Sequence, residues 1–138
     1  LEDGADSISI QARSPERALS LVARFDAGDG LRVVSDPGKA GRERFDVVVN
    51  ATPLGLHAGD PLPFDFECGP AVGAALDLVY APVETAWVHE ARRRGILAAD
   101  GREMLLAQGA AAFERWWGRP APVEAMRRAL DEVAVAAR

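Results

Sequence analysis

A run of three valines in the middle of the chain constrains the fold most strongly. Residues 45–50 read Phe-Asp-Val-Val-Val-Asn, and their β-branched side chains favour a strand. A continuous apolar run is typical of a strand that is covered on both faces, whereas a strand with one solvated face alternates apolar and polar residues. We therefore expect residues 45–50 to form a buried strand of a parallel sheet.

Strand and helix patterns alternate on both sides of this run. Helical patterns begin near Ser14, Glu84, Gly101 and Val123, between or after short β-branched segments. The further strands are expected at residues 7–11, 31–35, 74–80 and 96–99. This order predicts an α/β fold with a Rossmann-like, doubly wound, mostly parallel sheet and flanking helices.

The chain lacks one expected part of such a fold. It contains no G-x-G-x-x-G phosphate loop, and Gly4 resembles the glycine that closes an earlier helix. We therefore expect the first strand of the sheet and its glycine loop to precede Leu1. The helix that begins at Ser14 and Pro15 is expected to end at residues 28–30, and the proline- and glycine-rich residues 57–70 are expected to form an irregular surface excursion.

Composition argues against several classes of function. The formal net charge of −5 disfavours nucleic acid as a partner, because phosphate neutralisation needs a basic surface. Cys68 is the only cysteine, which excludes an internal disulfide and fits a cytoplasmic location. His57 and His89 are far apart and form no metal-binding motif, and no apolar run approaches the roughly 20 residues of a membrane span. We therefore expect no metal and no membrane partner.

Ligands of open α/β sheets bind beyond the carboxyl ends of the strands, and the first such end here carries two arginines. Arg13 and Arg17 are four residues apart around a predicted helix N-terminus, where free N–H groups and the helix dipole favour an anion. In a dinucleotide-binding sheet, arginine at this point accommodates the 2′-phosphate of NADP, whereas an acidic residue selects NAD. The alternative is a pair of solvated surface arginines.

Other strand ends and one helix carry further candidates. Small residues after Asn50 would let a cofactor approach the backbone, or they form a plain turn. Tyr80 offers a ring and a hydroxyl group, or it plugs the sheet edge. Met104 and Gln108 share one face of a helix, where they could cover a ring and reach a polyol, or belong to an ordinary amphipathic helix. Asp77 is a candidate acid, but no acid/base pair and no nucleophile set is evident.

Three of these segments together resemble the shikimate dehydrogenase family. The matching motifs are Asn-Ala-Thr-Pro-Leu-Gly at residues 50–55, Asp-Leu-Val-Tyr-Ala-Pro at 77–82 with Thr85, and Gly-Arg-Glu-Met-Leu-Leu-Ala-Gln at 101–108 with residues 113–116 and Gly118. The likeness runs over essentially the whole chain and implies the C-terminal, NADP-binding half of such an enzyme. The family catalyses reversible hydride transfer between NADPH and the carbonyl group of 3-dehydroshikimate.

The resemblance implies roles for the matched residues. The implied cofactor-binding residues are Arg13, Ser14, Arg17, Asn50, Ala51, Thr52, Leu78, Gly101 and Met104. The implied substrate-binding residues are Tyr80 and Gln108. Ala12 stands where the family usually has asparagine, which removes one hydrogen bond on the adenosine side.

The resemblance also implies what this chain lacks. The family's catalytic lysine and aspartate belong to an N-terminal substrate domain, and Lys39, the only lysine here, stands in the wrong context. We therefore expect residues 1–118 to form a partial NADP-binding domain that is inactive alone, and residues 119–138 to form a helix that packs towards the N-terminal domain. The natural protein is expected to be a monomer or a homodimer. The alternatives are a quinate-type paralogue that uses NAD or NADP, and a non-catalytic nucleotide-binding module.

Overall fold

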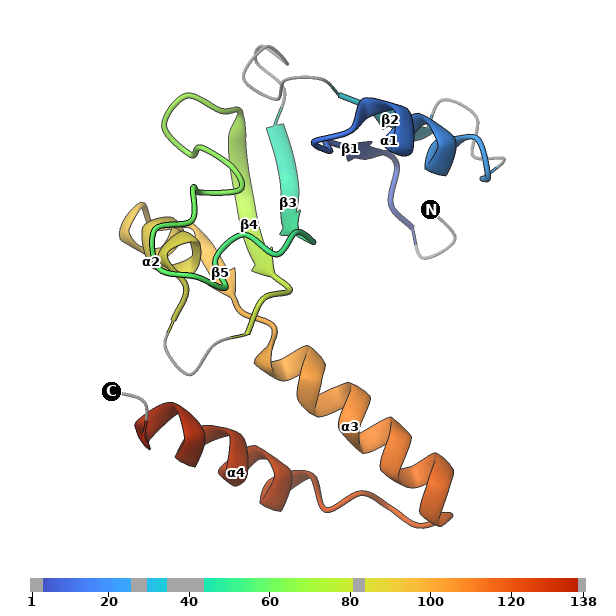
Figure 1. The fold of residues 1–138 in the computed structure, drawn as a ribbon, viewed down its shortest axis with the longest axis vertical. Helices are drawn as coiled ribbons and strands as arrows, with labels where there is room; N and C mark the ends of the chain where they lie inside the picture. The colour runs from blue at the N-terminus through green and yellow to red at the C-terminus, as the bar shows by residue number, and fades with distance from the viewer. Residues whose placement is uncertain (1–3, 26–29, 35–43, 81–83, 137–138) are drawn as a thin grey trace. The chain divides into compact units, whose positions relative to one another are not determined.

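The computed structural model describes residues 4–25, 30–34, 44–80 and 84–136, without the side chains of residues 134–136 (Figure 1). The chain forms two compact units. The first unit comprises Leu1–Glu43 with Glu67–Pro70, and the second comprises Arg44–Phe66 with Ala71–Arg138. Each unit is described by itself below.

The first unit contains a parallel strand pair and one helix. Its elements are β1 (Ile8–Ile10), α1 (Pro15–Val22) and β2 (Leu31–Val33). Ile8 is in register with Leu31. Parallel strands need a crossover connection, and α1 forms part of the connection between β1 and β2. The predicted strands and the predicted helix start are confirmed, with Ser14 at the N-cap and Pro15 in the first turn.

Helix α1 ends earlier than predicted. Its last residue is Val22, whereas the sequence pattern placed the end at residues 28–30. After Val22 the chain tightens, because the amides of Arg24 and Phe25 donate to the carbonyl oxygens of Leu21 and Val22 at 3.0 Å. These three-residue bonds replace the α-helical pattern and close the helix. The predicted helix before Gly4 falls largely on residues 1–3, which lie outside the described residues.

The second unit is built on a parallel sheet of three strands in the order β3-β4-β5. The strands are β3 (Arg44–Asn50), β4 (Ala71–Asp77) and β5 (Leu97–Ala99). Helix α2 (Ala86–Arg93) connects β4 to β5 and packs on both strands. The α/β prediction with parallel strands and flanking helices is therefore confirmed, although the described strands lie in two sheets, β1-β2 and β3-β4-β5.

The core of the second unit lies between this sheet and α2. Trp87 is 1% exposed, stacks on Phe66 with ring centroids 5.3 Å apart, and donates from its indole nitrogen to the Phe64 carbonyl oxygen at 3.1 Å. Phe64 itself is buried against Ala75 and the rest of this cluster. The prediction that residues 57–70 form only a surface excursion is therefore wrong at Phe64 and Phe66, whose rings fill the space beside α2.

The valine run of β3 is not covered on both faces. Val48 packs against the core, but Val47 and Val49 are 55% and 48% exposed. The register places Val47 in line with Ala74 and with Leu97, which is 77% exposed, on the face opposite α2. Within the described part of the second unit, α2 packs on this sheet and covers one face. The prediction of burial on both faces is wrong for this reason.

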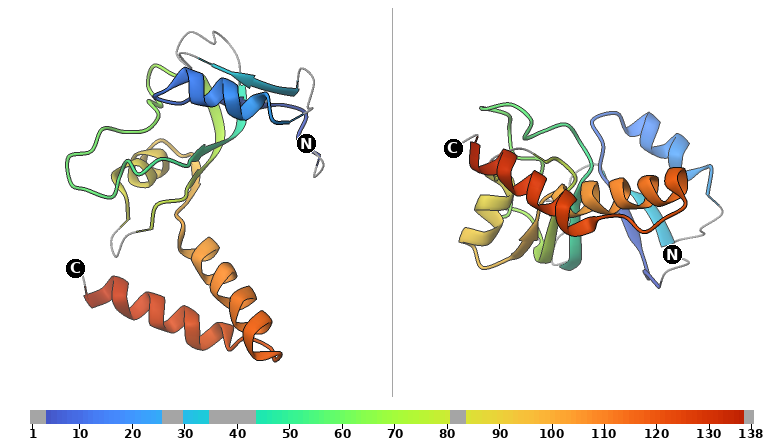
Figure 2. Two further views of the ribbon diagram at one scale, coloured as in Figure 1. Left: turned by 45° about the vertical axis from the view of Figure 1, so that its right-hand side comes forward. Right: turned by 90° about the horizontal axis from the view of Figure 1, so that it is seen from below.

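Two long helices complete the second unit. They are α3 (Arg102–Trp117) and α4 (Val123–Ala136). Gly118 ends α3 with a φ of 62°, the left-handed conformation that favours glycine, and α4 turns back to contact α3 (Figure 2). Glu103 and Arg127 form an ion pair between them. No helix among the described residues is long and apolar enough to cross a membrane.

Candidate functional site

The segments that follow β3, β4 and β5 are joined at the carboxyl edge of the sheet. The Leu78 amide donates to the Asn50 carbonyl oxygen at 2.9 Å, and the Gly101 amide donates to the Val79 carbonyl oxygen at 3.1 Å. The structure therefore brings together three predicted cofactor-binding residues, Asn50, Leu78 and Gly101. We call the surface formed by residues 50–54, 78–80 and 100–101 the strand-end rim.

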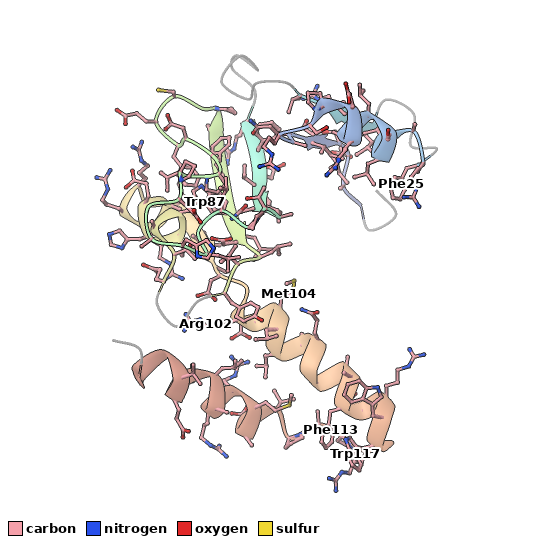
Figure 3. The ribbon with its side chains drawn as sticks, viewed as in Figure 1. Phe25, Trp87, Arg102, Met104, Phe113 and Trp117 are labelled. Carbon is pink, nitrogen blue, oxygen red and sulfur yellow. The ribbon has the colours of Figure 1, made fainter. Side chains whose placement is uncertain are left out.

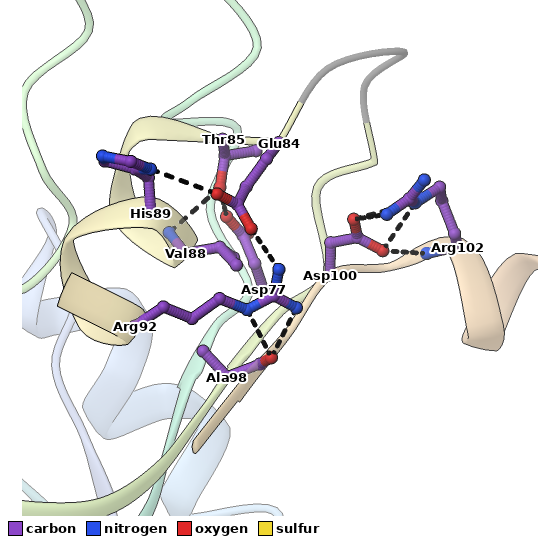
Figure 4. Close-up of polar contacts among 9 residues, drawn as sticks. All are labelled: Asp77, Glu84, Thr85, Val88, His89, Arg92, Ala98, Asp100 and Arg102. Atoms are coloured by element: carbon purple, nitrogen blue, oxygen red, sulfur yellow. Dashed lines mark hydrogen bonds and ion pairs between the residues drawn. The ribbon is translucent and has the colours of Figure 1, made fainter. Parts of the chain in front are cut away.

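Asp77 lies beneath this rim and is fully buried. One carboxylate oxygen accepts hydrogen bonds from the Asn50 amide nitrogen at 2.8 Å and from the Val79 backbone N–H at 3.0 Å. The other oxygen accepts from the Thr85 hydroxyl group at 2.7 Å (Figure 4). Both oxygens of this buried carboxylate are thus satisfied by donors, as a buried charge requires.

Asn50 connects Asp77 to the turn that follows β3. Its amide nitrogen also donates to the Leu54 carbonyl oxygen at 3.0 Å. Its amide oxygen accepts from the backbone N–H and the hydroxyl group of Thr52, at 3.0 and 2.7 Å. With 3% exposure and both ends of the amide in use, the Asn50 side chain shapes the turn from inside, while Ala51 and Thr52 are exposed on its outer side.

Gly101 fits closely against the turn after β4. It is buried, and a Cβ atom at this position would lie 2.5 Å from the Leu78 carbonyl oxygen. Such a distance is a steric clash with backbone, so glycine is needed for the approach of β5 to this turn. The close contact keeps Leu78, which is half-buried, next to the start of α3.

Asp100 and Arg102 hold the beginning of α3. Asp100 accepts hydrogen bonds from the Arg102 backbone N–H at 3.1 Å and from its guanidinium group at 2.8 Å (Figure 4). This hydrogen bond raises the pKa of Arg102 above its usual value, against a smaller opposing effect of burial. The helix start that carries Met104 is therefore anchored to the end of β5.

Three predicted site residues of the second unit, Tyr80, Met104 and Gln108, have accessible side chains. Tyr80 is 51% exposed and Met104 is 38% exposed at the beginning of α3 (Figure 3). Gln108 is exposed one turn further along the same helix face, and its amide nitrogen donates to the Met104 carbonyl oxygen at 3.3 Å. The predicted pairing of Met104 and Gln108 on one face is thus confirmed, and the Gln108 amide oxygen accepts no hydrogen bond from a described residue.

The first unit carries the remaining candidates. Ser14 occupies the N-cap of α1 without a side-chain capping bond. Arg13 and Arg17 are exposed, and neither guanidinium group is hydrogen-bonded or ion-paired to another described residue. Two guanidinium groups without a described partner, beside a helix N-terminus, are suited to bind a phosphate group. No group of three metal-ligating side chains is found in the described ranges.

Sequence reasoning missed the bonds around Asp77. Asp77 was a candidate acid and Asn50 a candidate cofactor contact, but their direct contact and the link to Thr85 were not predicted. Only part of the signal was present in the sequence, because Asn50 ends the predicted strand at residues 45–50 whereas Asp77 was expected inside a strand at residues 74–80. The structure ends β4 at Asp77 and pairs the two residues in register. Polar residues at such matched positions are candidates for hydrogen bonding across the sheet.

Comparison with known proteins finds similarity to shikimate dehydrogenases. Residues 101–130 match the family model of the shikimate 5′-dehydrogenase C-terminal domain. The NADP(+) shikimate dehydrogenase of Rubrobacter xylanophilus is 46% identical over 135 residues, which cover 95% of this chain and 47% of that protein. The corresponding enzyme of Moorella thermoacetica is 45% identical over 139 residues, covering 94% and 46%. The chain is therefore similar to shikimate dehydrogenases over nearly its whole length. It spans about half the length of these curated relatives.

Solved shikimate dehydrogenases have the same architecture. The Thermus thermophilus enzyme in complex with NADP(H) and shikimate superposes with a TM-score of 0.74 at 37% identity, covering 99% of this chain and 48% of that one. A chorismate mutase/shikimate 5-dehydrogenase fusion protein from Clostridium acetobutylicum gives a TM-score of 0.78 at 28% identity, covering 96% and 47%. The Rossmann-like assignment made from the sequence is therefore confirmed.

Proposed function

We propose that this chain is the NADP-binding half of a shikimate dehydrogenase. The observation that carries the proposal is the strand-end rim, where hydrogen bonds join Asn50, Leu78 and Gly101 at the edge where α/β sheets bind ligands. A relative of the same architecture forms a complex with NADP(H) and shikimate, which supports both ligands for this chain.

The rim suits the nicotinamide end of the cofactor. Ala51 and Thr52 are small and exposed, so a ring or ribose can approach the backbone between them. Leu78 and Met104 offer apolar surface for a flat ring, and the thioether of Met104 is well suited to contact with an aromatic system. We assign the nicotinamide to these residues, with Gly101 leaving room for close approach.

In the first unit, we assign the 2′-phosphate of NADP to Arg13, Ser14 and Arg17. The two guanidinium groups have no described partner, and the unused hydroxyl group of Ser14 stands at a helix N-cap. Charge-assisted bonds from arginine to phosphate are among the strongest hydrogen bonds in proteins. NAD lacks this phosphate, so these residues would favour NADP.

The reaction needs groups from both this chain and the rest of the protein. NADPH supplies a hydride, which adds to the carbonyl carbon of 3-dehydroshikimate, and the resulting alkoxide needs a proton to become the hydroxyl group of shikimate. Tyr80 and Gln108 are proposed to contact the substrate by hydrogen bonds. The proton donor is expected among the catalytic lysine and aspartate that the resemblance places in the N-terminal domain, so this chain alone is proposed to be inactive.

Two alternatives belong to the same site. A quinate-type paralogue would use the same rim with another cyclitol, and a non-catalytic module would bind the nucleotide without turnover.

The proposal also includes a small-molecule substrate, a cytoplasmic location and a monomeric or homodimeric protein. The C-terminal helix α4 is proposed to pack towards the N-terminal domain.

The test uses the natural full-length protein. Isothermal calorimetry with NADP and NAD, followed by assays with shikimate and quinate, is expected to show NADP binding and turnover of shikimate. Faster turnover of quinate would favour the paralogue. NADP binding without turnover of either substrate would favour the non-catalytic module, and no binding of either nucleotide would contradict the proposal.

A further inference from the structure

We propose that Asp77 is a positioning residue for the cofactor-binding turn, and that it acts through Asn50. This inference rests on the proposed function, because it explains how the rim is held ready for NADP. Asp77 reaches three separate segments, namely the turn after β3 through Asn50, the turn after β4 through Val79, and the N-terminus of α2 through Thr85. A single buried carboxylate thus joins two turns of the rim to each other and to the N-terminus of α2.

Asp77 is too deeply buried to contact a ligand directly. Its side chain is 0% exposed, and both oxygens accept hydrogen bonds at 2.7–3.0 Å. Ligands at the rim would meet Ala51, Thr52 and Tyr80, which are exposed. The role of Asp77 is therefore to hold other residues in place.

The bond to Asp77 helps to fix the orientation of the Asn50 side chain. Asn50 donates to Asp77 and to the Leu54 carbonyl oxygen with the same amide nitrogen, which fixes the orientation of its amide plane. With this orientation fixed, the Asn50 oxygen faces Thr52 and accepts two bonds from it. Rotation of the amide would place NH₂ against the donors of Thr52, so Asp77 and the Leu54 carbonyl oxygen together determine which way Asn50 can point.

Two turns of the strand-end rim depend on these bonds to Asp77. Ala51 lies between Asn50 and Thr52, and both of these neighbours are fixed by the bonds described above. The Val79 bond to Asp77 fixes the second turn, against which Gly101 packs. Loss of the carboxylate would free both turns at once, because buried polar groups without partners rearrange to find new ones.

Thr85 provides a second branch with a separate readout. Its hydroxyl group donates to Asp77 and accepts from the Val88 backbone N–H at 3.3 Å, so it caps α2 (Figure 4). A Thr85→Val variant keeps the shape but removes both bonds. It is expected to loosen the first turn of α2 while leaving the bonds between Asp77 and Asn50 in place. Thr85→Ser keeps the hydroxyl group and serves as its matched control.

The experiment measures hydrogen–deuterium exchange and NADP affinity in the full-length natural protein. Asp77→Ala is expected to speed exchange at the Thr52 amide by about tenfold and to weaken NADP binding by about tenfold, equivalent to ~1.4 kcal/mol each. Asp77→Asn retains one oxygen that can accept from Asn50 and Val79, and it is expected to restore most of both properties. Thr85→Val is expected to speed exchange at the Val88 amide but not at Thr52.

A core variant separates positioning from general loss of stability. Trp87→Phe removes the bond to the Phe64 carbonyl oxygen and weakens the same unit without touching Asp77. It is expected to lower the melting temperature while leaving Thr52 exchange and NADP affinity nearly unchanged. If Asp77→Ala does not fold, Asp77→Leu fills the space of the carboxylate without supplying an acceptor, and it is expected to give the same pattern at Thr52.

The outcomes of the two proposals differ. The exchange measurement needs no ligand, so faster exchange at Thr52 in a protein that never binds NADP would contradict the proposed function and leave the positioning of the turn supported. A parent protein that binds NADP, with Thr52 exchange and NADP affinity unaffected by Asp77→Ala, would overturn the positioning role. Equal losses of affinity in Asp77→Ala and Trp87→Phe at matched melting temperature would also overturn it.

Discussion

Gly101 lies against the carbonyl group of Leu78, so close that a Cβ atom on Gly101 would be 2.5 Å from the Leu78 oxygen. The backbone of Gly101 has a φ of −72°, which any residue can adopt, so the requirement for glycine is steric. This contact joins the ends of β4 and β5 and places the start of α3 beside the rim.

Gly101→Ala is expected to destabilise the protein by about 1–3 kcal/mol, because the added methyl group must displace backbone. Chemical denaturation would measure the change, and NADP calorimetry would show whether the rim is distorted as well. The matched control is Gly109→Ala in the middle of α3, where the Cβ atom would meet only the end of the flexible Met126 side chain at 2.9 Å. Alanine also favours helix over glycine by roughly 0.8–1 kcal/mol, so this control is expected to be far milder. Equal losses in the two variants would contradict the steric explanation.

Replacing Arg13 and Arg17 together by glutamine is expected to raise the KM for NADPH far more than the KM for NADH. Each charge-assisted bond to the 2′-phosphate is worth about 1.5–3 kcal/mol, so the double change should weaken NADPH binding by at least roughly 100-fold. Steady-state kinetics with both cofactors would measure the split. Arg24→Gln, another exposed arginine of the first unit, is the control and should affect neither cofactor. An equal effect of the double change on NADPH and NADH would show that the arginines do not bind the phosphate.

Gln108→Ala is expected to weaken substrate binding while leaving cofactor affinity nearly unchanged. The side-chain amide is exposed and bonded only within its own helix among the described residues, at the Met104 carbonyl oxygen. Its loss should therefore raise the KM for shikimate by roughly 2- to 10-fold, the effect of one neutral hydrogen bond. Calorimetry with NADP on the same variant supplies the comparison. A parallel fall in NADP affinity would assign Gln108 to the cofactor instead.

The pKa of Glu90 is expected to be about 2, because Arg93 and then Arg94 donate hydrogen bonds to its carboxylate. The folded-state pKa lies below the ordinary value of 4.5, so the stabilisation is present above that pH and is lost as the pH falls towards 2. A carboxyl titration by NMR would measure the pKa, and Arg94→Gln should raise it by removing one donor. A Glu90 pKa near the ordinary value in the parent protein would contradict the ion pairs at the end of α2.

Several helix ends and helix faces are features that a few neighbouring residues determine, and the sequence predicted these correctly. Ser14 and Pro15 start α1, and Gly118 ends α3, because capping and positive φ depend on a few neighbouring residues. Met104 and Gln108 share a face because four residues make about one helical turn. The order of strands and helices followed from the same short-range patterns, and with it the parallel α/β class.

Burial could not be read from the valine run, because it depends on what packs on each face. Val48 packs against the core beside α2, whereas its neighbours Val47 and Val49 lie on the face that no described helix of the second unit covers. No sequence pattern indicated that Phe64 is buried, because it stands in a proline-rich stretch. It belongs to the core because Trp87 lies beside it in space.

The sequence by itself determined the secondary-structure order, the resemblance to shikimate dehydrogenases and the residue types available at each strand end. Only the tertiary structure decided what Asn50 and Asp77 do, because they are 27 residues apart in the chain and meet through the register of β3 and β4. A hydrogen bond needs its partner within about 3 Å, and partners that distant in the chain are brought together only when the sheet forms. The exposed turn at Ala51 and Thr52 takes its shape from that buried contact.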